Sequence, residues 1–89
     1  MPTISIFFGI VVQMYWRDHA PPHVHAFYQG HEALVEIETG TVIRGRFPPA
    51  AAMLMRQWVL SRRGELRDNW QRGRDRLPFE RVAGADSDE

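Results

Sequence analysis

The 89-residue sequence contains no cysteine and no lysine, and it has no long uninterrupted apolar run. Without cysteine, neither a disulfide nor a thiolate–zinc site can form, and a reducing cytoplasm fits this composition. The apolar stretch from Ile4 to Trp16 contains Ser5, Gly9 and Gln13 and follows no basic region. It is too short to span a bilayer and lacks the pattern of a signal peptide, so we expect a cytoplasmic chain without membrane contact.

The formal net charge is zero, but the charges are unevenly distributed. Residues 1–43 carry one arginine against four acidic residues, residues 44–81 carry ten arginines against four, and residues 82–89 carry three acidic residues alone. Genome composition explains a chain whose basic residues are all arginine. The asymmetry also fits an anionic partner, because arginine binds carboxylates and phosphates through two parallel hydrogen bonds.

The length predicts one small domain with a thin core, for which oligomerisation or a bound partner would add stability. We place this domain at residues 1–80. Residues 81–89 are small and acidic, and we expect them to form a disordered tail.

An antiparallel meander of four or five strands is predicted for the first half of the chain. Between Ile4 and Trp16 every even-numbered residue is apolar, which predicts a strand with one buried side and a bend at Gly9. The odd-numbered side is mixed but includes Phe7, Val11 and Tyr15, so this side or a sheet edge is a candidate homodimer surface. Further strands are expected over residues 23–28, 32–38 and 41–47, separated by turns at Gln29-Gly30 and Thr39-Gly40.

Two helices are predicted after Pro48-Pro49, over residues 49–62 and 65–74. Apolar residues first recur at helical spacing from Ala51 to Val59 and then resume, rotated, at Leu66 and Trp70. We therefore expect a break near Arg63-Gly64, although one long bent helix is the alternative. The predicted fold is α+β, with both helices packed on one face of the sheet.

The chemistry-bearing segment is Asp18-His19-Ala20-Pro21-Pro22-His23-Val24-His25, which holds three of the four histidines. On a strand, His23 and His25 point the same way, about 6.5–7 Å apart, and can chelate zinc or a similar divalent metal. Asp18, His19 or His31 could supply a third ligand. Glu32, Glu36 and Glu38 could orient the rings.

Two other interpretations of this segment stay open. Asp18 with His19 or His23 could form a metal-free acid–base pair, because a carboxylate fixes the imidazole tautomer. No activated nucleophile accompanies it. The histidines could also simply pack beside Phe27, with Asp18 as a turn former.

The arginines of the second half suggest a nucleic-acid or protein contact. If residues 50–76 formed one helix, one face would carry Arg56, Arg63, Arg67 and Arg74. Two helices weaken this alignment, and a solvated face with local ion pairs such as Asp68–Arg72 is the alternative.

Several short motifs together resemble a small bacterial family, domain of unknown function 4160. They are Met1-Pro2-Thr3-Ile4-Ser5, Phe7-Phe8-Gly9-Ile10, Met14-Tyr15, the histidine segment, Ile37-Glu38-Thr39-Gly40 and Asn69-Trp70. The resemblance covers roughly residues 1–75 and marks Asp18, His19, His23 and His25 as the positions that matter most. It implies no established activity. The neighbouring gene in such families often encodes another small domain, which implies a two-gene module like a toxin–antitoxin pair.

The sequence therefore supports two hypotheses about function. The first is a cytoplasmic binding module that docks the neighbouring gene's protein, with RNA or DNA as a further partner. The alternative is a histidine-based or metal-dependent phosphodiesterase, similar to a ribonuclease, that uses His23 and His25 with Asp18 or His19.

Overall fold

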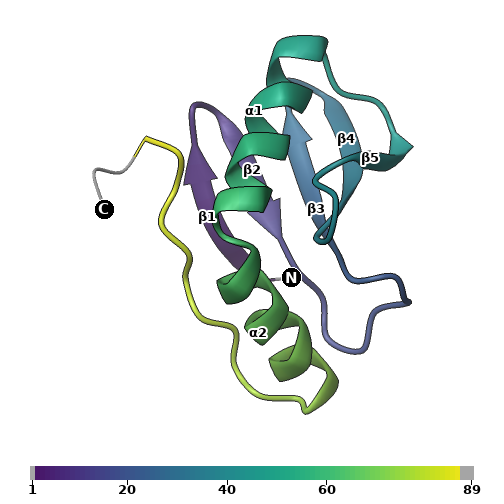
Figure 1. Ribbon diagram of the computed structural model, residues 1–89, viewed down its shortest axis with the longest axis vertical. Coiled ribbons are helices and arrows are strands. Elements are labelled where there is room, and N and C mark those ends of the chain that lie inside the picture. The colour runs from purple at the N-terminus through teal and green to yellow at the C-terminus, as the bar shows by residue number, and fades with distance from the viewer. Residues whose placement is uncertain (1, 87–89) are drawn as a thin grey trace.

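The computed structural model describes residues 2–86 and confirms the predicted α+β fold. Five antiparallel strands form one sheet in the order β1-β2-β3-β4-β5, and two helices follow (Figure 1). The elements are β1 Thr3–Phe7, β2 Ile10–Gln13, β3 His23–Tyr28, β4 His31–Glu36, β5 Val42–Gly45, α1 Pro49–Ser61 and α2 Arg63–Arg74. Within the described residues, no helix is long and apolar enough to cross a membrane.

The first two strands form a hairpin that is closed by Phe8 and Gly9. Both residues have positive φ, 51° and 78°, as a two-residue turn of this kind requires. The predicted bend at Gly9 is therefore a complete chain reversal, after which Phe7 pairs with Ile10 and Ile6 with Val11. In this hairpin each odd-numbered residue from Ser5 onward pairs with an even-numbered one, or the reverse, so the buried side is odd-numbered just before the turn and even-numbered after it. Ile4 is buried as well, next to the irregularity between Thr3 and Ser5.

This change of parity corrects one prediction. The expectation that all even-numbered residues share a buried side is wrong for Ile6, Phe8 and Trp16, which are 55%, 59% and 46% exposed. The parity change explains Ile6, whereas Phe8 lies in the turn and Trp16 lies in the loop after β2. Phe7, expected on the more open side, is buried and packs against Trp58 at 4.9 Å between ring centroids. The apolar residues that β1 and β2 leave outside the core are Ile6 and Val11.

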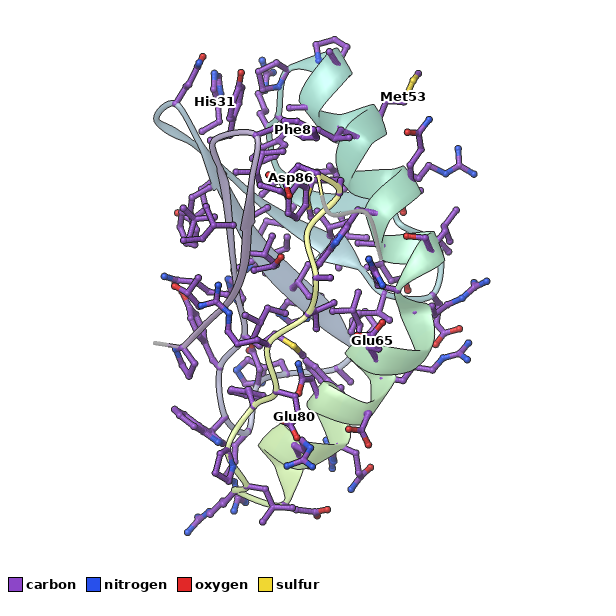
Figure 2. All side chains as sticks on the ribbon, turned by 90° about the vertical axis from the view of Figure 1, so that its left-hand side faces the viewer. Phe8, His31, Met53, Glu65, Glu80 and Asp86 are labelled. Carbon is purple, nitrogen blue, oxygen red and sulfur yellow. The ribbon has the colours of Figure 1, made fainter. Side chains whose placement is uncertain are left out.

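The remaining strands keep the predicted faces. Val24 and Ala26 of β3 pair with Val35 and Ala33 of β4, and all four are buried. The core joins this face of the sheet to α1 and α2 through Met55, Trp58, Val59 and Leu66. Figure 2 shows the two layers from the side, with both helices on one face of the sheet. His25 pairs with Leu34 and therefore belongs to the opposite face.

Two helices form, as predicted, and the break lies at Arg62, whose φ and ψ are −112° and 19°. Gly64 is inside α2 and does not mark the break. Pro49 begins α1, where its missing N–H leaves no hydrogen bond unmade.

The segment after α2 runs back along the molecule between β1 and the helices (Figure 2). The Val82 N–H donates to the Ile4 carbonyl oxygen at 2.9 Å, and Trp58 Nε1 donates to the Ala83 carbonyl oxygen at 2.8 Å. Val82 is buried, so the packed domain extends past residue 80, where we expected the tail to begin. Residues 87–89 of that tail lie outside the described residues.

Candidate functional site

The loop between β2 and β3 brings the Asp18 carboxylate next to the two imidazole rings of β3. Asp18 Oδ2 lies 2.8 Å from His25 Nε2 and 3.0 Å from His23 Nε2. Strand alternation places both imidazoles on the same face. One ligand atom from each of the three residues lies within 4.8 Å of the other two. We call these three residues the Asp18–His23–His25 cluster.

The carboxylate of Asp18 is fixed by contacts to both of its oxygen atoms. Oδ1 accepts the His19 backbone N–H at 2.8 Å, while Oδ2 faces the two rings. Burial acts to raise the pKa of Asp18, but the hydrogen bond from His25, the His19 N–H and the charges of both imidazoles outweigh it. The pKa therefore lies below its ordinary value, and the carboxylate is the stable form at neutral pH.

His23 turns both ring nitrogens toward oxygen acceptors. Its Nδ1 atom lies 2.7 Å from the Pro21 carbonyl oxygen, which can only accept, so Nδ1 carries a hydrogen. In the neutral ring, Nε2 then presents a lone pair to the Asp18 carboxylate at 3.0 Å. Two acceptors at this distance repel each other, so the arrangement calls for a proton or a cation between them.

His25 offers only its Nε2 atom for chemistry. Its Nδ1 atom is buried and has no hydrogen-bond partner among the described residues. Tyr15 stacks on the ring with 4.1 Å between ring centroids and fixes its plane. Both rings of the pair are thus held with Nε2 directed at the same carboxylate oxygen.

A cleft of about 340 Å³ opens beside the cluster. The side chains of His23, His25 and Asp18 are only 8%, 12% and 15% exposed. Besides the cluster, the cleft is lined by His19, Pro21, Leu34, Ile43 and Arg44, among others. Trp70 of α2 packs against His23, with 5.4 Å between ring centroids. The rings are therefore packed on one side and reach the cleft on the other.

The other predicted ligands and orienting groups are not brought to this point. His19 is exposed and lines the cleft outside the cluster, and His31 lies at the tip of the β3–β4 hairpin (Figure 2). Glu32 is exposed and pairs with Phe27, Glu36 accepts the Thr39 hydroxyl, and Glu38 binds Arg67. The orienting acceptor is the Pro21 carbonyl oxygen, which sequence reasoning missed. The only hint of this contact in the sequence was that Pro21-Pro22 directly precedes His23.

The four predicted arginines do not act as one stripe. Arg63 donates to the Glu38 carbonyl oxygen at 2.7 Å, and Arg67 donates through two nitrogens to the Glu38 carboxylate, so both hold the β4–β5 turn. Arg56 is exposed on α1 beside Gly40. Arg74 alone reaches the site, where it lines a hollow of about 220 Å³ with Arg17 and Asp18.

Comparison with protein families gives a match over residues 9–71 to the family described as Domain of unknown function (DUF4160). The chain belongs to the DUF4160 family. The matched region of this DUF4160 domain includes Asp18, His23 and His25 and ends just after Asn69-Trp70. Neither the curated proteins nor the solved structures provide a significant match.

Within this DUF4160 domain, Asn69 and Trp70 have different tasks. Asn69 is fully buried and hydrogen-bonds the backbone of Glu80, which ties the C-terminal segment to α2. Trp70 supports the His23 ring. The two residues named together in the sequence thus support the fold and the site respectively.

Proposed function

We propose that Asp18, His23 and His25 bind one divalent transition-metal ion and that the protein is a metal-dependent phosphodiesterase. The observation that carries the proposal is the convergence of two Nε2 atoms on one carboxylate oxygen, at 2.8 Å and 3.0 Å. Two imidazoles and one carboxylate form a ligand set that zinc accepts. Three protein ligands leave a further position open, as is typical of catalytic zinc sites.

The second contact of His23 supports this proposal. Imidazoles that bind metals usually donate their other N–H to a carboxylate or a backbone carbonyl group. The Pro21 carbonyl oxygen, 2.7 Å from His23 Nδ1, fits that role. A cation between Nε2 and Oδ2 would also remove the repulsion between two facing acceptors.

A metal-free acid–base mechanism fits the same geometry less well. A general acid or base must bring one ring nitrogen within hydrogen-bonding reach of the substrate. Both Nε2 atoms are directed at Asp18, the Nδ1 atom of His23 is directed at Pro21, and the Nδ1 atom of His25 is buried. Neither ring therefore keeps a free nitrogen toward the cleft.

The surroundings favour a phosphate ester as the substrate. Asp18 lines two hollows, the cleft that also contains Arg44 and a second hollow that contains Arg17 and Arg74. Guanidinium groups bind phosphate oxygens well because their N–H groups match the geometry of the anion. A divalent ion bound by the cluster would supply Lewis acidity toward a phosphoryl oxygen.

Hydrolysis of a simple diester tests the proposal. Protein purified without a histidine tag is assayed with bis(p-nitrophenyl) phosphate, with added zinc or manganese and again after chelation. We expect metal-dependent release of p-nitrophenol that falls more than about tenfold in His25→Gln, because loss of a group that merely orients a metal ligand already lowers metal affinity or activity by that much. His31→Gln removes an exposed histidine at the far hairpin and serves as the matched control.

The binding-module hypothesis predicts a different outcome of the same experiment. The wild-type protein would then be inactive with every metal, and the product of the neighbouring gene would bind wild type and His25→Gln equally well. That result would overturn the phosphodiesterase proposal.

A further inference from the structure

We infer that Arg17 and Arg74 form a phosphate-binding subsite next to the Asp18–His23–His25 cluster and that it takes a phosphate group of a single-stranded nucleic acid. The inference deepens the proposed phosphodiesterase function and rests on it for its place in a reaction. The two arginines come from different parts of the chain, the β2–β3 loop and the end of α2, yet they line one hollow of about 220 Å³ with Asp18.

The backbone beneath these two arginines is fixed. The Arg17 N–H donates to the Gly73 carbonyl oxygen at 3.3 Å, and Trp16 Nε1 donates to the Leu77 carbonyl oxygen at 2.9 Å. The Trp16 ring also stacks on Phe79, with 4.9 Å between centroids. The loop is therefore joined to α2 at the Arg17 backbone and to the segment after α2 through the Trp16 side chain.

Gly73 allows this close approach. A Cβ atom on residue 73 would lie 3.0 Å from Phe79 Cε1 and 3.5 Å from the Tyr15 carbonyl oxygen. A side chain at residue 73 would therefore crowd the Phe79 ring, on which Trp16 stacks, whereas the Tyr15 carbonyl oxygen is at an ordinary contact distance. The absence of a side chain at residue 73 thus helps to bring Arg17 next to Arg74.

The fold does not use the guanidinium groups of these two residues. Within residues 2–86, no carboxylate or carbonyl group pairs with the side chain of Arg17 or Arg74, whereas Arg63, Arg67 and Arg72 all have such partners. Asp18 does not fill this role, because its two oxygens already face the His19 N–H and the two imidazoles. The hollow therefore presents two cations whose natural complement is an anion.

The position of the hollow indicates what kind of molecule carries the phosphate group. Asp18 lines both the arginine hollow and the cleft that contains Leu34 and Ile43. A molecule that occupies both hollows would place a phosphate group between Arg17 and Arg74 and present an apolar or planar group, with a further phosphate near Arg44, to the cleft. A single nucleic-acid strand offers both, since phosphates and bases alternate along it.

Binding of a fluorescein-labelled decauridylate in EDTA tests the inference. Chelation prevents cleavage and makes the measurement independent of the metal site. We expect Arg17→Gln and Arg74→Gln each to weaken binding roughly three- to tenfold, the range for loss of one hydrogen bond of ordinary strength at an exposed side chain. Each variant should also reduce the slope of log K against log salt by about 0.7, the value for one phosphate contact with a single strand.

Arg56→Gln is the matched control, because it removes the same charge from an exposed helix position away from the hollow. Its affinity and salt slope should stay close to wild type. Wild-type protein that does not bind the strand, or equal losses in all three variants, would overturn the inference. Zinc titration of Arg17→Gln and Arg74→Gln should still match wild type, so a failed subsite and a failed metal site can be told apart.

Discussion

Asn69 and Glu80 exchange two hydrogen bonds across the gap between α2 and the C-terminal segment. Asn69 Nδ2 donates to the Glu80 carbonyl oxygen, and the Glu80 N–H donates to Asn69 Oδ1, each at 2.8 Å. The Asn69 side chain thereby pairs with the backbone as a neighbouring strand would. This contact lies one residue from Trp70, the aromatic support of His23.

Replacement of Asn69 should destabilise the whole domain. In Asn69→Ala, a fully buried side chain is lost and the partly buried Glu80 N–H and carbonyl group lose their partners, so we expect a loss of about 2–3 kcal/mol. For a domain of this size, that corresponds to a fall in melting temperature of roughly 10 °C or more. Thermal unfolding followed by circular dichroism measures it, with Gln71→Ala, an exposed change on the same helix, as the control. Equal melting temperatures in the two variants would contradict this role of Asn69.

Gly45 lies in a crowded position and Gly64 in an open one, so substitution of these two glycines by alanine tests the fold. Gly45 ends β5 with φ of 81°, and a Cβ there would overlap the Glu32 carbonyl oxygen of the paired strand. Gly45→Ala should therefore lower the free energy of unfolding by about 2 kcal/mol or more. Gly64 lies in α2 with open space around it, and Gly64→Ala should raise stability by about 0.5 kcal/mol. Chemical denaturation measures both, and a tolerated Gly45→Ala would show that the β4–β5 pairing is wrong.

The ion pair between Glu38 and Arg67 predicts a measurable titration. The hydrogen bond from Arg67 is the largest cause that lowers the pKa of Glu38, and the charges of Arg67 and Arg63 add to it. A carboxyl group with a lowered pKa stabilises the fold above its unfolded-state pKa, and this contribution is lost as pH falls through the folded-state value. NMR of the Glu38 side-chain carboxyl carbon as a function of pH should give a titration midpoint below the ordinary glutamate value. Arg67→Gln should move this midpoint upward. An unchanged midpoint would rule out the pair in solution.

The strand order and the two helices were predictable because they follow from local periodicity and short turns. The histidine segment was visible directly in the sequence. The parity change at Phe8-Gly9 could not be obtained from alternation, since a hairpin and a single bent strand give the same apolar pattern over Ile4–Trp16. The burial of Val82 was missed because it depends on Ile4, 78 residues away in the sequence.

The residues of the candidate site could be predicted from the sequence, but their spatial arrangement could not. Spacing along β3 placed His23 and His25 on one face, as found, but the choice of Asp18 over His19 depends on the path of the β2–β3 loop. The neighbouring position of Arg17 and Arg74 depends on tertiary contacts of the β2–β3 loop with Gly73 and Leu77, which have no signature in the sequence. The homodimer, the cytoplasmic location and the partner from a neighbouring gene stay predictions.

Isothermal titration of zinc into chelator-treated protein without a histidine tag tests the central claim most directly. We expect one zinc ion per chain for the wild type and for His31→Gln, and a loss of that binding in His25→Gln and in Asp18→Asn, because each removes one of three converging ligands. Circular dichroism of each variant establishes that it is folded. Wild-type protein that takes up no zinc, cobalt or manganese, or folded His25→Gln protein that binds zinc as tightly as wild type, would contradict the account.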